Sequence, residues 1–597
     1  MTTLDHGVIG NGRILALVSP TSAVEWLCMP RFDSPSVFGR LLDKDKGGTF
    51  RFLVDGEEQR GLQSYVPNTN VLRTVFEGKS GTFEVIDFCP RHVRGLGVEV
   101  PVELVRILRP LTGAPRICVD IDPRPDYARV TPTVSMLENG LAFDGGGRRF
   151  HLQSNLSLAH IEGKHEFTLR SPIFFTFTCS APDKRADIRK IDESLEETVA
   201  GWRAWAKTCA LPTFAPEWVL RSALCLKLHA YEDTGAIIAA TTTSVPEAMG
   251  TERTWDYRYC WLRDAAFVVE ALRRLSQLRE GERFIKFLRD VCDDGPLTPL
   301  VRVDGRRDLH EEKLEHLAGY GGNGHVRIGN AAAEQRQNDL NGELVLCLAT
   351  MLTDLRIVHD NPRSFMPLVE RLVDGAIEAA PQPDTSIWEF RTHLRHYTFS
   401  RTMCWAAVDR GARLARAVGR GDLADRWGPI AQREREIILA RGYSQRHGFF
   451  TQTLDGDFAD ASNLLMPTLG IIDGRDPRFL STLDAYEVRL AKNGLLRRYV
   501  NEDDFGETTS AFTLCSFWWA EALALAGRLD EAITVFNRVV AFANPLRLFS
   551  EDIEPSTGTL LGNYPQAYTH VGLIHAAMTI SDLLEARDGR VRAWMMP

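Results

Sequence analysis

The stretch at residues 381–397 reads PQPDTSIWEFRTHLRHY and lies between two long helical patterns. Apolar residues recur at helical spacing over residues 362–380 before it and over residues 398–418 after it. A connection of this length inside a compact domain is usually functional or disordered. Trp388, Glu389 and the arginines that follow them favour an ordered segment. We therefore interpret the stretch as a functional loop between two helices.

The same order of helix and connection continues through the whole chain after residue 216. Helical periodicity marks about twelve stretches, and short and long connections alternate between them. Short links join antiparallel neighbours, so this order predicts helical hairpins with all the long loops at one end. The expected architecture is an (α/α)6 barrel with a pocket at one mouth. The predicted helices cover residues 216–231, 264–278, 280–292, 331–358, 362–380, 398–418, 422–441, 461–471, 477–492, 508–526, 529–542 and 566–587.

The N-terminal part of the chain has the pattern of strands. GTFRF at residues 48–52 and GTFEVIDF at residues 81–88 alternate in polarity and are rich in β-branched and aromatic residues. Many short strands without helices between them predict a β-sandwich. The fold class expected for the chain is therefore a β-sandwich followed by an (α/α)6 barrel.

These patterns divide the chain into two domains and a linker. We predict the β-sandwich domain over residues 1–182, a linker with a helix over residues 183–215, and the barrel domain over residues 216–597. Ser194 and Glu197 have the spacing of a capping box, which predicts that the linker helix begins near Ser194.

The composition excludes several classes of protein. The 597 residues carry a net charge of -9 and show no basic stripe, so nucleic acid is not an expected partner. No apolar run approaches the roughly 18 residues of a membrane helix, and the N-terminus lacks the pattern of a secretory signal. The 11 cysteines are scattered through apolar runs, as in a reduced cytoplasmic protein. Without a CxxC or HExxH pattern, we predict neither a metal nor another cofactor, and a homo-oligomer stays open.

Residues 255–264, WDYRYCWLRD, have a composition suited to sugar binding. Aromatic faces can cover the C–H faces of a pyranose ring, and Arg and Asp can form charge-assisted bonds to neighbouring hydroxyls. The alternative is structural, because Asp264 opens a predicted helix and could serve only as its N-cap.

Two acidic residues in long loops are candidates for chemistry. Glu389 could protonate a glycosidic oxygen, and Glu551 in the last long loop could accept a proton from water. Two carboxyl groups on opposite sides of a pocket are the minimum apparatus of a glycosidase. Asp552 and Glu554 share the loop of Glu551 and are rival candidates, and each acid could also be an ordinary solvated loop residue.

Several separated motifs resemble glycoside hydrolase family 15, which contains glucoamylases, glucodextranases and trehalases. IGNGR at residues 9–13 and WLCMPRFDSPSVFGRLLD at residues 26–43 are similar to the opening of its bacterial members. The motifs YRYCWLRDA, VRIGNAAAEQ, IWE, LCSFW and SEDIEPSTGTLLGNYPQAYTHVGLI follow in the family's order. The resemblance covers nearly the whole chain and implies the same fold that the loop pattern predicts.

The resemblance also implies roles for individual residues. Glu389 would be the general acid and Glu551 the general base of a reaction that inverts the anomeric carbon. Phe390 and the pair Thr508 and Thr509 depart from residues common in the family, which leaves the reducing-side subsite undefined. The residues implied to bind substrate are Tyr257, Arg263, Asp264, Trp388, Arg498 and Tyr568.

The function expected from these observations is exo-acting, inverting hydrolysis of a small α-glucoside. We expect a trehalase first, because the chain shows neither an export signal nor an appended starch-binding domain. A glucoamylase or another α-glucan exo-glucosidase is the alternative. A disaccharide phosphorylase is a remoter one, since it would need no second carboxylate, and a non-catalytic sugar-binding protein would have lost the acids. The expected partner is a small carbohydrate.

Overall fold

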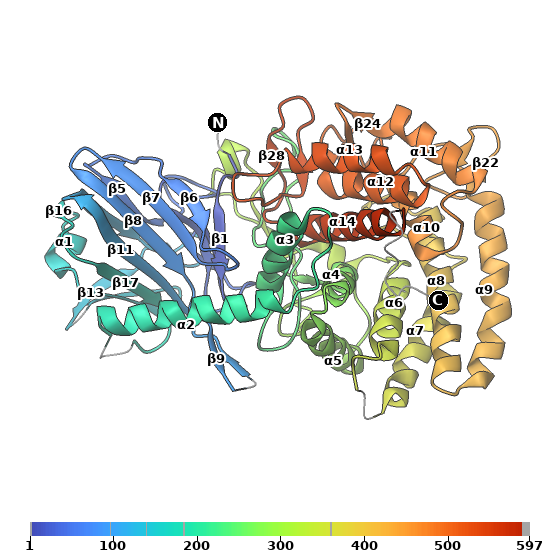
Figure 1. The fold of residues 1–597 in the computed structure, drawn as a ribbon, viewed down its shortest axis with the longest axis horizontal. Helices are drawn as coiled ribbons and strands as arrows, with labels where there is room; N and C mark the ends of the chain where they lie inside the picture. Colours follow the sequence, from blue (N-terminus) through green and yellow to red (C-terminus); the bar gives the residue numbers. More distant parts are fainter. Residues whose placement is uncertain (1–2, 96, 139, 183–185, 359–360, 588–597) are drawn as a thin grey trace.

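The computed structural model describes residues 3–95, 97–138, 140–182, 186–358 and 361–587. Residues 183–185, the first three of the predicted linker, lie outside the described residues. Figure 1 shows two bodies side by side, a β-rich one from the N-terminal part of the chain on the left and a helical one on the right. The predicted fold class is confirmed in this arrangement, whereas the exact domain bounds stay a prediction.

The N-terminal body is a sandwich of two antiparallel sheets. Phe50 and Phe52 on one sheet pack against Phe175 on the other, with ring centroids 5.8 and 5.4 Å apart. The first sheet has the order β1 (Gly7–Gly10), β2 (Leu15–Val18), β3 (Val24–Cys28), β5 (Thr49–Val54), β12 (Arg116–Asp122) and β16 (Phe167–Thr168), with β4 (Ser36–Phe38) paired to β3. The second has the order β13 (Thr133–Leu137), β14 (Gly140–Gly145), β15 (Arg148–Ser154), β17 (Ile173–Thr178), β11 (Glu103–Gly113), β8 (Gly81–Phe88), β7 (Leu72–Gly78) and β6 (Leu62–Tyr65).

The linker helix α2 covers Ile188–Lys207, so its predicted start at Ser194 is wrong. The helix begins after Asp187, whose side chain accepts a hydrogen bond from the backbone N–H of Lys190 at 2.9 Å. Ser194 lies inside the helix and contacts His92 of the sandwich at 2.9 Å instead. The capping-box spacing therefore occurs here within a helix. α2 runs along the sandwich toward the barrel (Figure 1).

Helices α3 to α14 form the barrel, with every second helix facing its axis. The inner helices contact one another in the order α4, α6, α8, α10, α12 and α14, and α14 returns to α4; the step from α8 to α10 passes through a short 3-10 helix. The inner helices are α4 (Leu262–Arg274), α6 (Leu340–Thr353), α8 (Thr398–Ala417), α10 (Met466–Leu469), α12 (Thr513–Leu525) and α14 (Ala567–Arg587). The outer helices are α3 (Pro216–His229), α5 (Leu278–Asp294), α7 (Met366–Ala379), α9 (Gly421–Arg441), α11 (Pro477–Leu490) and α13 (Leu529–Val540).

Burial explains which helices occupy the inner ring. α12 is buried on all sides from Thr513 to Ala524, whereas the outer helix α5 buries one face that includes Phe284 and Leu288. A helix that is apolar all round requires neighbours on every side, and an amphipathic helix requires them on one. The predicted helix at 331–358 is observed as α6, Leu340–Thr353, and is shorter than expected. Residues 335–339 before it are not helical, and Gln335 among them lines the pocket at the barrel mouth.

The sandwich supports the loop that enters α4. The indole N–H of Trp26 donates to the carbonyl of Thr241 at 2.9 Å. Arg258 is fully buried and donates to the carbonyl of Ser34 at 2.8 Å and to the hydroxyl of Tyr127 at 2.9 Å. The N-terminal domain therefore holds both the backbone of this loop at Thr241 and the Arg258 side chain of the predicted sugar-binding stretch.

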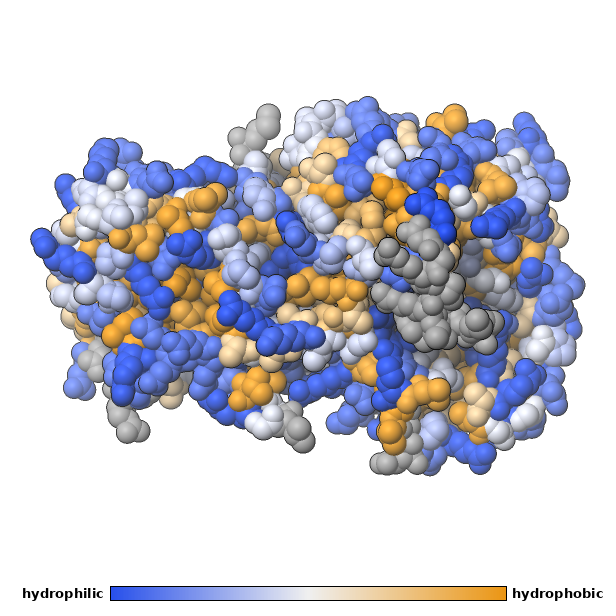
Figure 2. Space-filling view, viewed as in Figure 1, coloured by the Kyte–Doolittle hydropathy of each residue, from blue (hydrophilic) through white to orange (hydrophobic). Residues whose placement is uncertain are grey.

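Figure 2 shows hydrophilic side chains over much of one face, with apolar residues scattered among them. Within the described residues, every helix is too short or too polar to serve as a membrane span.

Candidate active site

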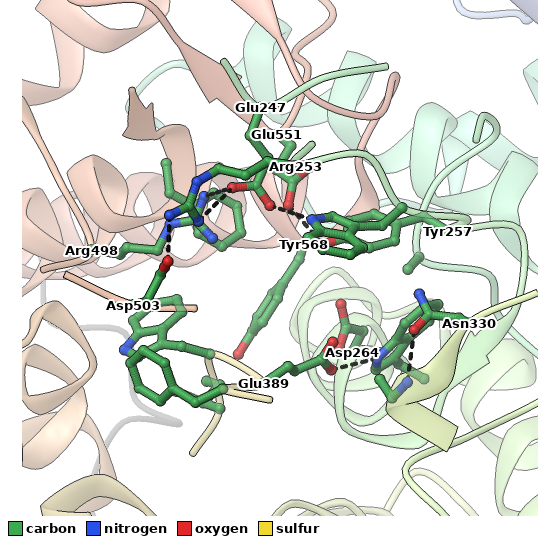
Figure 3. A pocket seen from close by; sticks show the side chains of 18 of the residues that line it. Glu247, Arg253, Tyr257, Asp264, Asn330, Glu389, Arg498, Asp503, Glu551 and Tyr568 are labelled. Carbon is green, nitrogen blue, oxygen red and sulfur yellow. Dashed lines mark hydrogen bonds and ion pairs between the residues drawn. The ribbon is translucent and has the colours of Figure 1, made fainter. Parts of the chain in front are cut away.

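A pocket opens at the mouth of the barrel (Figure 3). The loops before α4, α6, α8, α12 and α14 contribute its walls. All eight residues predicted to form the site line it. The lining residues include Glu247, Arg253, Trp255, Tyr257, Trp261, Arg263, Asp264, Gln335, Trp388, Glu389, Arg391, Arg498, Asp503, Asp504, Phe505, Glu551 and Tyr568.

Glu389 sits in a strained turn, with a φ of 62° in the left-handed region. Strain of this kind persists only where the surroundings hold it and is common at active sites. Oε1 of its side chain accepts from the indole N–H of Trp261 at 2.7 Å, from Gln337 at 3.1 Å and from Arg263 at 3.3 Å. The three donors converge on Oε1, so any proton that this carboxyl group carries would sit on Oε2.

Glu551 is 1% exposed and stands apart from Glu389 across the pocket (Figure 3). Oε1 accepts from the hydroxyl of Tyr257 at 2.8 Å, and Oε2 accepts from the backbone N–H of Asn563 at 3.3 Å. A Cβ on Gly562 would lie 2.6 Å from the Cβ of Glu551, so the neighbouring position requires glycine. The Glu551 side chain is therefore held by Tyr257, by the backbone of Asn563 and by close packing against Gly562.

The surroundings of Glu551 favour its neutral form. Burial is the largest cause of its raised pKa, and the negative charges of Glu247 and Asp552 raise the pKa further. Arg498 and the hydroxyl of Tyr257 act in the opposite direction. A carboxylate with a raised pKa accepts a proton from water more readily than an ordinary one, which suits a general base.

The rival acids in the last loop have other partners. Asp552 is fully buried and accepts from Ser510 at 2.8 Å and from Arg498 at 3.4 Å. Glu554 accepts from the hydroxyl of Ser556 in the turn that follows. Of these three acids, only Glu551 is among the residues that line the pocket.

The deep end of the pocket carries the groups predicted to hold a sugar. Arg263 donates to Asp264 at 3.1 Å, and burial raises the pKa of that carboxyl to about 6. Asp264 lies in the first turn of α4, where the N-cap position belongs to Trp261, so the capping interpretation is wrong. The buried hydroxyl of Tyr568 has no hydrogen-bond partner among the described residues. Trp388 donates its indole N–H to Asp460 at 2.9 Å, which fixes the ring at the wall.

Several groups at the site were not predicted from the sequence. Gln337 donates to Glu389, and Gln335 donates to its backbone carbonyl at 3.0 Å. Glu247 accepts from Arg498 at 2.5 Å. The motif VRIGNAAAEQ ends at Gln335, and Gln337 follows two residues later. This position at the end of a motif was the one feature of the sequence that could have indicated the two glutamines.

Comparison with known proteins identifies the family. A family model described as "Glycosyl hydrolases family 15" matches residues 214–578, and one described as "Trehalase-like, N-terminal" matches residues 3–165. The chain belongs to glycosyl hydrolase family 15. As a member of this family it is a glycoside hydrolase, which cleaves O-glycosyl bonds with inversion.

The similar proteins match nearly the whole length of this family 15 member. A trehalase of Mycolicibacterium smegmatis is 35% identical, over 98% of this chain and 92% of its own length. A trehalase of Thermoplasma volcanium is 33% identical, over 98% of this chain and 95% of its own length. The solved structure of a bacterial glucoamylase complexed with acarbose covers 98% of this chain and 96% of its own, with a TM-score of 0.72. At 14% identity, that likeness shows the fold alone.

Proposed function

We propose that this family 15 hydrolase cleaves α,α-trehalose into two molecules of glucose. The observation that carries the proposal is the similarity to proteins named trehalase, at 33–35% identity over 98% of the chain. A glucoamylase that removes glucose from longer α-glucans is the second candidate, since the family contains both activities.

The outer end of the pocket supports a short substrate. Residues 499–508, here called the mouth loop, reach across to the loop at 381–397. The carboxylate of Asp504 accepts from the backbone N–H groups of Arg391 at 2.6 Å and Thr392 at 3.0 Å. These residues are partly exposed, which marks the outer end, whereas Asp264 and Tyr568 at the other end are buried. A bridged mouth favours a short substrate over a long α-glucan chain.

The proposed mechanism assigns one proton transfer to each carboxyl group. Glu389 gives its proton to the oxygen between the two glucose units, and that C–O bond breaks. Glu551 takes a proton from the water that attacks the same anomeric carbon from the opposite face. The attacked glucose leaves in the β form, and the other keeps its α configuration. Arg263 and Asp264 would orient the attacked glucose through its hydroxyls.

We also propose a cytoplasmic location, as expected from the sequence. All the cysteines are free, and most of them are buried. Burial raises the pKa of the Cys260 thiol to about 12, for example, so it is an inert core residue.

A substrate panel tests the proposed function. The protein is incubated with trehalose, maltose, isomaltose and maltoheptaose, with and without phosphate, and released glucose is measured. We expect the highest kcat/KM on trehalose and no requirement for phosphate as co-substrate. A higher kcat/KM on maltoheptaose than on trehalose would assign the chain to the glucoamylases.

A further inference from the structure

Glu247 is a buried carboxylate at the pocket wall, and neither the sequence motifs nor the proposed mechanism uses it. It lies in the loop between α3 and α4 and is 3% exposed. Oε1 accepts from the indole N–H of Trp255 at 2.8 Å, and Oε2 accepts from Arg498 at 2.5 Å. A second guanidinium, that of Arg253, lies 3.9 Å away. A carboxylate this deeply buried is stable only with such partners.

Glu247 and Asp552 hold Arg498 from two sides. The guanidinium lies 2.5 Å from Glu247, 3.4 Å from Asp552 and 5.3 Å from the ring centroid of Phe512. Its Nε is buried and has no hydrogen-bond partner among the described residues, although Arg498 lines the pocket. This donor is therefore unpaired. The position of the guanidinium depends on both carboxylates, because rotation of the side chain would break its ion pair with each of them.

Glu247 also lies beside Glu551 in the pocket wall (Figure 3). The charged and titratable groups that face Glu551 come from three loops: Glu247, Arg253 and Tyr257 before α4, Arg498 before α12, and Asp552 beside Glu551 itself. The negative charge of Glu247 opposes ionisation of Glu551, and Arg498 favours it. Any change at Glu247 alters both influences in the same direction, because a released Arg498 is free to turn toward Glu551.

We propose that Glu247 is a positioning residue for the base side of the reaction: it fixes Arg498 next to Glu551 and sets the pH at which Glu551 becomes an active base. The inference rests on the proposed role of Glu551 and not on trehalose as the substrate. It applies to whichever α-glucoside the enzyme hydrolyses.

The pH dependence of E247Q is the first test. Glu551 must be ionised to act, so kcat/KM is lost as the pH falls through its raised pKa. Removing the charge of Glu247 lowers that pKa, and the acid limb of the kcat/KM profile should move to lower pH by about half a unit or more. At the optimum, kcat/KM should fall at least about tenfold, the loss expected for one hydrogen bond to a charged group. E247D should restore part of the activity and move the limb less.

The matched control is E252Q, which removes an exposed acid from the same loop and should leave kcat/KM and the limb unchanged. Profiles are recorded on trehalose or on maltose, whichever the wild type hydrolyses faster, so failure of the trehalose assignment does not affect the test. An unmoved acid limb in E247Q, with activity either kept or lost equally at every pH, would overturn the proposal. If E247Q does not fold, E247A, which also removes the charge, is judged by the same criterion.

A double-mutant cycle is the second test, because it distinguishes a Glu247 that acts through Arg498 from one that acts independently of it. E247Q, R498K and the double variant are compared on the same substrate. If Glu247 acts through Arg498, the double variant should lose no more kcat/KM than the worse single variant. Losses that multiply would show that the two residues act independently and would contradict the proposal.

Discussion

Glu389 and Glu551 are the same amino acid in two different surroundings. Glu389 is met by three donors on one oxygen, and its side chain is 20% exposed. Glu551 is enclosed, and two further acids lie near it. Carboxyl groups in contrasting environments are the usual arrangement of an acid and a base in glycosidases. The proposed acid and the proposed base therefore differ in burial and in hydrogen-bond partners.

Replacing the acid tests its role at the residue scale. Glu389→Gln keeps the shape of the side chain but cannot donate the proton, so kcat should fall at least about a hundredfold with a modest change in KM. Glucosyl fluoride, whose leaving group needs less protonation, should be spared in part. Steady-state kinetics on both substrates measure the difference.

The control for this experiment is Glu334→Gln, an exposed acid outside the pocket lining, which should keep wild-type kinetics. Near-normal turnover of trehalose by Glu389→Gln would remove Glu389 from the mechanism.

Both carboxyl groups were predictable because each lies in a long loop and in a recognisable motif. Gln337 and Glu247 were not, because their roles depend on partners far away in the sequence. Gln337 meets Glu389 across 52 positions, and Glu247 meets Arg498 across 251. Only the fold brings such pairs together, and neither residue type indicates a role by itself.

At the scale of elements, the mouth loop contacts two other loops, the one before α4 and the one before α8. Asp503 pairs with Arg253 at 2.5 Å, and Asp504 binds the backbone of the loop at 381–397. The ring of Phe505 packs against Trp255 at 5.1 Å. These contacts hold the mouth loop against the neighbouring loops, and their loss should open the outer end of the pocket.

Asp504→Ala should therefore relax the preference for short substrates. The ratio of kcat/KM on maltoheptaose to kcat/KM on trehalose should rise about tenfold, since charge-assisted bonds to two backbone N–H groups are lost. Glu502→Ala changes an exposed residue of the same loop and should leave the ratio as it is. If both variants keep the wild-type ratio, the mouth loop does not set substrate length.

The first residues of helices α2 and α6 were not predicted correctly from the sequence. The order of short and long connections predicted the barrel because it depends on many residues at once. The start of α2 depends on one hydrogen bond, between Asp187 and Lys190, and the rival pattern at Ser194 is indistinguishable in sequence. The start of α6 was also missed. Residues 335–339 leave the helical pattern and contact the loop at 381–397, and such tertiary contacts are not visible in the sequence.

At the scale of the whole molecule, the sandwich and the barrel are joined by buried polar contacts. Arg258 pairs with Asp256 at 2.6 Å, and both side chains are fully buried. Because Arg258 also binds Ser34 and Tyr127 of the sandwich, it connects the stability of the two domains.

Arg258→Met should lower the free energy of unfolding by about 3–5 kcal/mol, because Asp256 is left as an unpaired buried charge. Urea unfolding followed by tryptophan fluorescence measures the change. Arg13→Met removes an exposed bridge to Asp233 between the same domains and should cost at most about 1 kcal/mol. Equal losses in the two variants would contradict the importance of the buried contact.

The central claim is hydrolysis of trehalose with inversion at one anomeric carbon, by Glu389 as acid and Glu551 as base. Proton and carbon NMR of the first products, formed in water enriched in oxygen-18, tests it most directly. The account predicts α- and β-glucose in equal amounts before mutarotation, with the heavy oxygen only in the β anomer. Initial formation of α-glucose alone, with the label in an α anomer, would contradict inversion and the role of Glu551 as the base.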